Sequence, residues 1–589
     1  MRRLIPCLTM LLMPLLACAA EIPAGGTPLI AGEGFGTLKL IGKEAAATAP
    51  QIVEAPGQPF GKAMRITMTK KPAQRWDLQL KAPTAAPVKR GDAMLAVFWG
   101  RTLDSKAETG EGETELVFEL DRTPHTKSVE HPGQFAREWT QVMIPFTAAA
   151  DYAAGEAGIL LRLGYGPQTI EIGGVQVLNY GKAVRMQDLP RTRTGYAGSA
   201  MDAPWRKAAD ERIEKHRKAD LTVLVVDAAG KPVPGAQVSV QMRRHAFGFG
   251  SAVAAKQLLD QSPDSQKYRE IIEKNFSRIV FENDLKWPAW NRQQVPEAID
   301  WLRSRNIEVR GHCIVWPSWQ HTPRDLQALK NDPAALRKRV NDHVTEIVAA
   351  NKGKLVDWDV INEVYTNHDV VDVLGKPAMV EWFKLAHAAD PAVNLYINDY
   401  SILSGGGLDT AHQDAYEQVI RYLKEQGAPI HGVGLQSHFG ARLTSPEKLL
   451  QILDRFAAPG LKLQSTEFDI NITDEPLQAD YTRDFMTTLF SHPAVDGIVM
   501  WGFWEGRHWK PNAALWRKDW SIKPNGQAWL DLVTKKWWTD VAATTAADGK
   551  CQTRGFLGDY EISVTAAGKT KSAKAQLGKT GQTVKVVLE

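Results

Sequence analysis

The chain contains very little cysteine. Four of its 589 residues are cysteine, and beyond residue 20 only Cys313 and Cys551 remain. Two cysteines so far apart in the sequence form no disulfide framework, and their spacing is not that of metal ligands. We therefore expect two isolated thiols and no metal site.

The chain also lacks an excess of charge of one sign. It has 71 basic and 67 acidic residues, which give a formal net charge of +4. This balance gives no electrostatic reason for nucleic-acid binding, so we exclude nucleic acid as a partner. A chain of this length is too long for a single hydrophobic core, and we expect several domains.

Long hydrophobic runs are absent except at the N-terminus. Residues 1–20 carry Arg2 and Arg3, then an apolar run from Leu8 to Leu16, then small residues. This pattern predicts a secretory signal peptide, and the run is too short to span a membrane. The tripeptide before Cys18 resembles a bacterial lipobox, in which that cysteine carries a lipid. We expect export, either as a free secreted or periplasmic protein or as an outer-membrane lipoprotein anchored at Cys18.

Residues 21–185 predict an antiparallel β-sandwich. Short alternating segments, for instance 93–99 and 114–120, are separated by turns that contain Gly and Pro. The segment 169–179 looks like the last strand of a jelly-roll carbohydrate-binding module. No residue pattern fixes a sugar-binding face, so a glycan-binding module and a purely structural domain stay open as alternatives.

Two smaller segments flank the central part of the chain. Residues 186–244 predict a linker, a charged helix and a β-hairpin over 221–242, because two apolar alternating runs are separated by a turn rich in Gly and Pro. Residues 541–589 predict a C-terminal β appendage, to which we assign a structural role.

Between them, residues 245–540 alternate strands with helices, which is the pattern of a parallel sheet. Eight strands are expected at Phe247–Ala252, Arg278–Glu282, Glu308–Val315, Val356–Asn362, Leu395–Asn398, Gly432–Gln436, Leu461–Glu467 and Gly497–Trp501. This length suits a (β/α)8 barrel, which typically needs about 250 residues. The predicted fold class is therefore α/β: a (β/α)8 TIM barrel with an N-terminal β-sandwich and small all-β accessory segments.

Polar side chains gather where the predicted barrel strands end. Glu363 closes the fourth strand and Glu467 the seventh, and strand ends form the functional rim of such a barrel. Two glutamates on one rim suggest the paired carboxylates of glycoside hydrolysis, whereas ordinary solvent-facing carboxylates are the alternative. Many of the 19 Trp residues fall near the same rim. Their flat, half-polar side chains suit sugar rings, although core packing explains about half of them equally well.

Six motifs occupy the strand ends in a fixed order. They are Glu282-Asn-Asp-Leu-Lys286-Trp, Gly311-His-Cys-Ile-Val-Trp316, Trp358-Asp-Val-Ile-Asn-Glu363, Gln436-Ser-His438, Thr466-Glu467-Phe-Asp469 and Trp501-Gly502. With these motifs the barrel resembles glycoside hydrolase family 10, the family of retaining endo-β-1,4-xylanases, over about half of the chain. The resemblance implies hydrolysis of xylan or xylooligosaccharides without a metal or an organic cofactor. We expect a monomer.

The resemblance also assigns roles to individual residues. Glu363 would be the general acid/base and Glu467 the nucleophile of a double displacement, with the two carboxyl groups about 5–5.5 Å apart. The residues expected to contact sugar are Asn283, Lys286, His312, Trp316, Asn362, Gln436, His438, Trp501 and Trp509. The residues expected to support them from behind are Glu282, Asp469 and Asp399, with Asp469 orienting His438.

Two segments depart from the family pattern. Trp316 is followed by Pro317-Ser318-Trp319, where family members usually carry His and then Ser-Gln, and the loop 502–509 is bulkier than usual. Pro317 removes a backbone donor, and Trp319 offers a stacking surface. We expect both changes to reshape the pocket on the non-reducing side. Two other functions stay open: hydrolysis of another β-linked glycan, and glycan binding at the cell surface with little turnover.

Overall fold

The computed structural model describes residues 21–30, 38–45, 48, 50–107, 110–135, 137–192 and 195–588. The predicted signal segment and Cys18 lie outside these ranges. The chain divides into two compact units, one built from residues 1–103, 112–133 and 138–193 and the other from residues 104–111, 134–137 and 194–589. Within the described ranges, no helix combines the length and the apolar character needed to cross a membrane.

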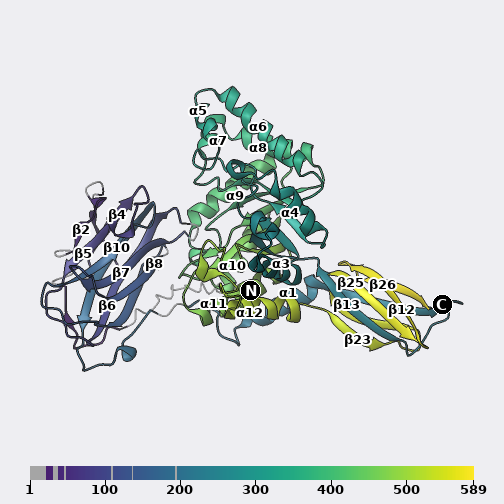
Figure 1. The fold of residues 1–589 in the computed structure, drawn as a ribbon, viewed down its shortest axis with the longest axis horizontal. Helices are drawn as coiled ribbons and strands as arrows, with labels where there is room; N and C mark the ends of the chain where they lie inside the picture. Colours follow the sequence, from purple (N-terminus) through teal and green to yellow (C-terminus); the bar gives the residue numbers. More distant parts are fainter. Residues whose placement is uncertain are drawn as a thin grey trace, which may run out of the picture. The chain divides into compact units, whose positions relative to one another are not determined.

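The first unit is a sandwich of two β-sheets (Figure 1). One sheet has the order β3-β4-β11-β6-β9, with β1 paired to β11, and the other has the order β2-β5-β10-β7-β8. The strands are β1 (Thr27–Pro28), β2 (Lys39–Ile41), β3 (Gln51–Glu54), β4 (Lys62–Met68), β5 (Gln79–Pro83), β6 (Ala93–Ser105), β7 (Gly112–Leu120), β8 (Lys127–Phe135), β9 (Thr140–Thr147), β10 (Ala157–Arg162) and β11 (Gln168–Asn179). Alternate apolar side chains such as Leu80, Phe118 and Leu161 are buried and form the core.

The second unit contains the predicted closed barrel of eight parallel strands. Its order is β19-β18-β17-β16-β15-β14-β22-β21, and β21 pairs back to β19, which closes the barrel. The strands are β14 (Gly248–Val253), β15 (Arg278–Phe281), β16 (Glu308–Gly311), β17 (Asp357–Asn362), β18 (Asn394–Asp399), β19 (Gly432–Leu435), β21 (Lys462–Ile470) and β22 (Val495–Met500), with the short β20 (His438–Phe439) beside β21. The α/β barrel prediction is confirmed, although the third strand ends at Gly311 rather than at Val315.

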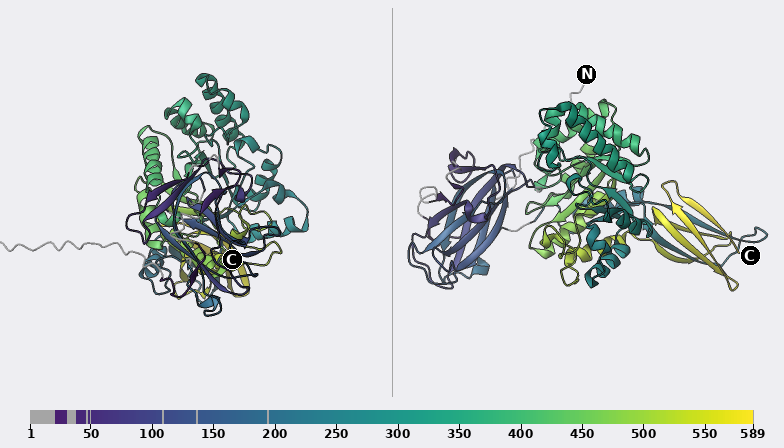
Figure 2. Two further views of the ribbon diagram at one scale, coloured as in Figure 1. Left: turned by 90° about the vertical axis from the view of Figure 1, so that its left-hand side faces the viewer. Right: turned by 45° about the horizontal axis from the view of Figure 1, so that its top comes forward.

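Helices surround the barrel strands (Figure 2). They are α2 (Ala255–Leu259), α3 (Pro263–Asn275), α4 (Gln294–Arg303), α5 (Arg324–Ala328), α6 (Pro333–Ala350), α7 (Asp369–Leu374), α8 (Pro377–Ala389), α9 (Thr410–Glu425), α10 (Pro446–Ala457), α11 (Glu475–Ser491) and α12 (Pro524–Leu530), and α1 (Pro204–Arg217) precedes the barrel. Helix α10 shows why they form and where they pack. Ser445 caps its N-terminus, and Leu449, Ile452, Leu453 and Phe456 place one apolar stripe against the barrel.

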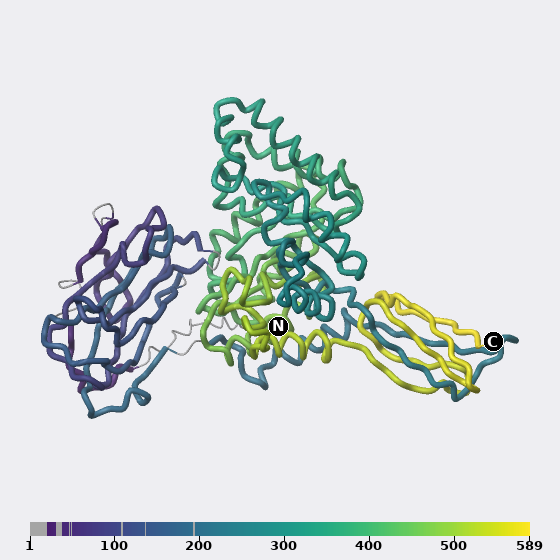
Figure 3. The backbone as a smooth tube through the Cα atoms, in the orientation of Figure 1, coloured from purple at the N-terminus to yellow at the C-terminus, as the bar shows by residue number. Residues whose placement is uncertain are grey.

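The β-hairpin predicted over 221–242 is not formed. Strand β12 (Lys218–Asp227) pairs with β24 and β27, whereas β13 (Gln237–His245) pairs with β23 and β25. The partner strands are β23 (Asp540–Thr544), β24 (Lys550–Phe556), β25 (Gly558–Ala566) and β27 (Gln582–Leu588), and β26 (Lys569–Leu577) extends the second sheet. The segments on either side of the barrel sequence therefore build one two-sheet body (Figures 1 and 3).

The physical reason for this correction lies in the alternation of the two strands. Val223 and Val225 of β12 and Val238 and Val240 of β13 are all buried, at every second position. Such alternation shows that one face of a strand is covered, but it does not show which strand lies beside it. The residues 541–589 are thus no separate appendage, because their strands supply the neighbours that β12 and β13 need.

Candidate active site

Glu363 follows the last residue of β17 at the rim of the barrel. Its backbone has a φ of 56°, in the left-handed region that residues with a side chain seldom adopt. Its amide hydrogen bonds to the carbonyl of Asn398 at 2.8 Å, which holds the chain in this turn. Sparsely populated backbone conformations persist only where neighbouring contacts enforce them, and they cluster at functional sites.

Three amide side chains donate hydrogen bonds to the carboxylate of Glu363, which is 8 % exposed. Gln436 Nε2 lies 2.8 Å from Oε1, and Asn362 Nδ2 lies 3.2 Å from the same oxygen. Asn367 Nδ2 lies 3.2 Å from Oε2. Asn362 and Gln436, both predicted to contact sugar, therefore also fix the position of this carboxylate.

Glu467 lies within β21, with 4 % of its surface exposed. Asn398 at the end of β18 donates one amide group both to Glu467 Oε1 at 2.8 Å and to Asn362 Oδ1 at 2.9 Å. Since Asn362 in turn donates to Glu363, two asparagine amides connect the two glutamates. The predicted catalytic pair is thus brought together on one rigid frame of neighbouring strand ends.

His438 lies between two carboxylates. Its Nε2 is 3.2 Å from Glu467 Oε2, and its Nδ1 is 3.0 Å from Asp469 Oδ2. Burial alone would lower the pKa of His438, but the charges of Asp469 and Glu467 outweigh burial and raise it to about 10. The imidazole is therefore a cation at neutral pH. Trp509 Nε1 donates to Asp469 at 2.7 Å and completes this group.

The pKa of Glu467 is lowered despite its burial. Burial would raise this pKa, but the charges of His312, His438 and Lys286 together lower it. Glu467 is therefore ionised at neutral pH, which is the state a nucleophile requires. The pKa of Asp469 is lowered for the same reason, because the charge of His438 outweighs the effect of burial.

A chain of buried charges connects Glu467 to the interior of the barrel. His312 Nδ1 lies 3.9 Å from Glu467 Oε1 and 2.8 Å from Asp359 Oδ2. Asp359 also accepts two hydrogen bonds from Arg310, which bonds to Asp357 as well. Because Arg310 is fully buried, Asp359 is held rigidly and His312 has one defined orientation.

Aromatic rings and one lysine surround the open side of the two glutamates. Lys286 Nζ lies 5.1 Å from the ring centre of Trp316 and 5.9 Å from that of Trp501. It donates to Asn283 Oδ1 at 3.0 Å, so two of the predicted sugar-binding residues contact each other. The ring of His312 meets Trp501 edge-on at 5.1 Å. The arrangement offers hydrogen-bonding edges and flat apolar faces, which a polyhydroxylated ligand needs.

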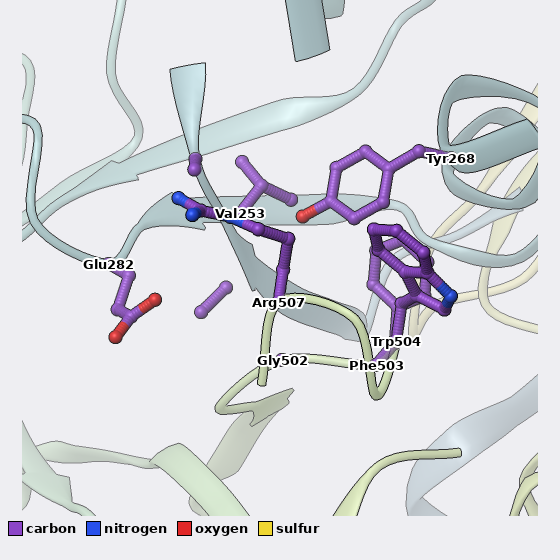
Figure 4. A pocket seen from close by; sticks show the side chains of 9 residues that line it. Val253, Tyr268, Glu282, Gly502, Phe503, Trp504 and Arg507 are labelled. Carbon is purple, nitrogen blue, oxygen red and sulfur yellow. The ribbon is translucent and has the colours of Figure 1, made fainter. Parts of the chain in front are cut away.

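Glu282 lies beside this group, in a recess that also contains Arg507 (Figure 4). The other residues that line the recess are Ala252, Val253, Ala254, Tyr268, Gly502, Phe503 and Trp504. Burial raises the pKa of Glu282, the charge of Glu467 adds to this effect, and Lys286 and Arg507 oppose it. Glu282 is thus within electrostatic reach of Lys286 and Glu467.

Asp399 does not point toward the two glutamates. Its Oδ1 accepts hydrogen bonds from His412 Nε2 of α9 at 3.0 Å and from the amide of Tyr400. The neighbouring Asn398, for which we predicted no role, points to Glu467 instead. Side chains alternate along a strand, and Asn398 pairs in register with Asn362, so the alternation of β18 was the signal that could have identified it.

The segment after Trp316, the first of the two departures from the family pattern, packs against the Trp316 ring. The ring of Trp316 stacks on His321 with the ring centres 3.6 Å apart and an angle of 14°. Trp319 is half-buried, and its amide donates to Asp369 at 2.9 Å. Burial, with a smaller effect from Lys286, lowers the pKa of His321 to about 4, so this ring is neutral at neutral pH. The loop after β16 therefore covers one face of Trp316 with a second ring.

The site can donate protons and supply an ionised carboxylate on one rim. Among the residues that the structure describes, no group of His, Cys, Asp and Glu is arranged to hold a metal ion, and Cys313 and Cys551 are buried, free thiols. The chemistry available from the chain itself is acid/base and nucleophilic chemistry by two carboxyl groups.

Comparisons with known proteins agree on the barrel. Residues 239–531 match the family model of glycosyl hydrolase family 10. The chain is 33 % identical over 376 residues to the anti-sigma-I factor RsgI6 of Acetivibrio thermocellus, which covers 62 % of this chain and 47 % of that protein. It is 30 % identical over 376 residues to endo-1,4-beta-xylanase 1 of Arabidopsis thaliana, which covers 62 % of this chain and 38 % of that protein.

Among solved structures, the native xylanase 10B from Thermotoga maritima is similar, with 25 % identity and a TM-score of 0.46 over 49 % of this chain and 96 % of that chain. The chain spans less than half of the length of the two curated relatives named above. The family model and the motifs at the strand ends cover the same barrel. Through this barrel, the chain belongs to glycosyl hydrolase family 10.

Proposed function

We propose that the chain hydrolyses internal β-1,4-xylosidic bonds of xylan with retention of the anomeric configuration. Glu363 serves as the general acid/base and Glu467 as the nucleophile. The observation that carries the proposal is the pair of carboxylates connected by Asn362 and Asn398, with the cation His438 3.2 Å from Glu467. This arrangement gives the two carboxyl groups different environments, as acid and nucleophile require.

In the first step, Glu467 attacks the anomeric carbon while Glu363 gives its proton to the oxygen of the leaving sugar, so the glycosidic bond breaks and a glycosyl ester forms. In the second step, Glu363 takes a proton from water, and the hydroxide attacks the ester and releases Glu467. His438 keeps Glu467 ionised before the attack. Asn362 is placed to hydrogen-bond the 2-hydroxyl of the reacting sugar.

The substrate assignment rests on the relatives that are named endo-1,4-beta-xylanases and on the polar rim described above. The remaining predicted sugar contacts, from Asn283, Lys286, His312, Trp316, Trp501 and Trp509, belong to the same proposal. A second candidate is a glycan-binding role with little turnover. The polar groups and flat rings at the barrel rim suit binding of a glycan as well as its cleavage.

The products released from arabinoxylan, with mixed-linkage β-glucan and cellulose in parallel, test the proposal. We expect short xylooligosaccharides from the wild type and none from Glu467→Ala, and nuclear magnetic resonance of the first products should show the β-anomer. Release from β-glucan alone would assign another substrate. No release from any polysaccharide by a folded wild-type chain would favour the binding role.

We further propose that residues 1–20 direct export of the chain. A lipid at Cys18 would place the protein in a membrane fraction, and plain cleavage would leave it in the periplasm or the medium. Fractionation of cells that express the wild type and Cys18→Ala separates these outcomes. Retention of both forms in the cytoplasm would contradict export.

A further inference from the structure

Trp76 of the first unit is unusually exposed to solvent for a tryptophan. It is 51 % exposed and, in the described ranges, one of three large hydrophobic residues with this degree of exposure. It lies in the short turn Arg75–Asp77 directly before β5. The guanidinium of Arg162 lies 5.7 Å from the centre of the Trp76 ring. One face of the indole therefore packs against a charged group, while about half of the residue's surface stays exposed to solvent.

A second aromatic ring is fixed beside this turn. Tyr165 lies in the loop between β10 and β11, and Arg75 lies 5.2 Å from its ring centre. The amide of Gly164 donates to the carbonyl of Arg75 at 3.1 Å. A Cβ at Gly164 would lie 2.7 Å from that carbonyl oxygen, so only glycine permits the two loops to approach this closely. Trp76 and Tyr165 therefore lie on two segments that are hydrogen-bonded to each other.

Charged residues lie on the adjoining sheet. Strand register places Arg162 of β10 directly between Gln79 of β5 and Glu115 of β7. Arg162 and Glu115 are only 6 % and 4 % exposed. Arg162 lies 3.0 Å from Glu115, 2.6 Å from Glu130 and 3.6 Å from Glu119. The sheet thus carries a rigid group of buried ionic side chains close to Trp76.

Three buried polar atoms near Trp76 have no hydrogen-bond partner among the described residues. They are Arg162 Nε, Gln79 Oε1 and the hydroxyl oxygen of Tyr165. Buried polar groups in folded proteins are almost always hydrogen-bonded, and each exception calls for an explanation. Three such atoms close to one half-exposed indole mark a polar region whose hydrogen-bonding capacity is not used within the described residues.

The charges in this region are balanced. Arg162, Arg75 and Lys127 make ion pairs with Glu115, Glu119 and Glu130, so three cations face three carboxylates. An anionic or cationic ligand would gain little from such a surface. A neutral molecule rich in hydroxyl groups can stack an apolar face on the half-exposed indole and can hydrogen-bond to polar groups at the edge of the ring.

We propose that this surface, the Trp76 face (Trp76, Gln79, Glu115, Arg162 and Tyr165), binds a neutral β-1,4-linked xylan chain. The site is separate from the two glutamates of the barrel and needs no turnover. The choice of xylan rests on the function proposed for the barrel, whereas binding of a neutral glycan rests on the Trp76 face alone. The first unit then holds the polysaccharide while the barrel cleaves it.

Binding stoichiometry tests this proposal on the full chain. Isothermal titration calorimetry with xylohexaose, using the Glu467→Ala variant to prevent hydrolysis, should give two sites per chain. Adding Trp76→Ala should leave one site. Adding Ile52→Ala, which removes a large side chain of similar exposure from β3 of the opposite sheet, should leave two. Trp76 is half exposed, so its removal opens no core cavity.

The outcomes separate the two proposals. If the barrel does not bind xylan, the Glu467→Ala chain has one site, and Trp76→Ala removes it. If Trp76→Ala and the second variant Gln79→Ala both leave the stoichiometry and the affinity unchanged, the Trp76 face is not a xylan site. In the active enzyme we expect Trp76→Ala to lower release from insoluble xylan severalfold and to leave hydrolysis of a small aryl xyloside unchanged. An equal loss on both substrates would overturn the proposal.

Discussion

Replacement of His438 by Asn removes the cation that lies between Glu467 and Asp469. The contact distances are 3.2 Å to Glu467 and 3.0 Å to Asp469. Asparagine carries no charge, and its amide reaches about as far as Nδ1 of the imidazole, so it can still contact Asp469 but not Glu467. The substitution therefore removes the whole interaction of the imidazolium with Glu467, its charge and its hydrogen bond together.

The size of the effect follows from the pKa and from the distance. The pKa of His438 is about 10 against an ordinary value of 6.5, and at about 1.4 kcal/mol for each pKa unit this corresponds to about 5 kcal/mol that favours the cation. Independently, unit charges 3.2 Å apart interact by about 1.3 kcal/mol at the dielectric constant of water and by about 5 kcal/mol at an effective value of 20. The pKa of His438 and the interaction at an effective dielectric constant of 20 both give more than the roughly 1.4 kcal/mol that equals a tenfold change, and the value in water lies close to it.

The direction of the pH effect follows from the loss of the cation beside Glu467. In the wild type the neighbouring cations lower the pKa of Glu467, so this carboxyl group, the nucleophile of the proposed mechanism, stays ionised to lower pH. Without the imidazolium this pKa rises, and activity disappears at a higher pH as the solution is acidified. We expect kcat/KM near pH 5 to fall by roughly tenfold or more, and the loss to shrink as the pH rises.

The assay is the pH profile of kcat/KM for an aryl xyloside with a good leaving group, whose first step needs little protonation and therefore reports on Glu467. His412→Asn is the matched control, because His412 is also buried and paired with an aspartate, Asp399, but lies on α9 away from the glutamates. Its acidic limb should coincide with that of the wild type. A His438→Asn profile that is lowered equally at every pH would refute the electrostatic role and leave only a contact with substrate.

Four further predictions follow from the same contacts. Glu363→Gln should abolish turnover of xylan but spare aryl glycosides with good leaving groups, and equal loss on both in a kinetic comparison would exclude Glu363 as the acid. Asn398→Ala should lower kcat by about tenfold to a hundredfold, since a buried hydrogen bond to a charged group contributes about 1.5–3 kcal/mol. Asn394→Ala at the start of the same strand is the control, because the Asn394 side chain donates to the carbonyl of Val356 and not to Glu467, and it should change kcat little. The folded-state pKa of His438 lies above its ordinary value, so the stability that the protonated imidazole adds is complete below about pH 6.5 and is lost as the pH rises through about 10. The free energies of unfolding of the wild type and His438→Asn, measured in denaturant, should therefore converge above pH 10. Arg310→Met removes the guanidinium that bonds to both buried aspartates, Asp357 and Asp359, and should lower the free energy of unfolding by about 3–5 kcal/mol, whereas an unchanged midpoint in denaturant would contradict a stabilising role of this cation.

Much of the barrel and of its site could be predicted from the sequence. A parallel strand buried on both faces produces a short apolar run, and helices between such runs repeat at a recognisable spacing. The placement of Glu363 and Glu467 on one rim could also be predicted, because polar residues at the ends of such apolar runs lie at the C-terminal ends of the barrel strands. The pairing of β12 and β13 could not be obtained in this way, because apolar alternation reports burial of a face and carries no information on the neighbouring strand.

The role of Asn398 shows where local patterns stop being sufficient. Asn398 and Asp399 are adjacent, both polar and both at the end of β18, and only the register of β18 against β17 decides which one faces Glu467. The stagger of strands in a closed barrel is a property of the whole sheet, since each strand must match two neighbours at once. The same holds for the Trp76 face, whose members come from a turn, a loop and three strands that meet only after the sheet β2-β5-β10-β7-β8 has formed. Residue types at strand ends can therefore be predicted from sequence, but which of them touch each other is decided by tertiary register, and the chemistry depends on those contacts.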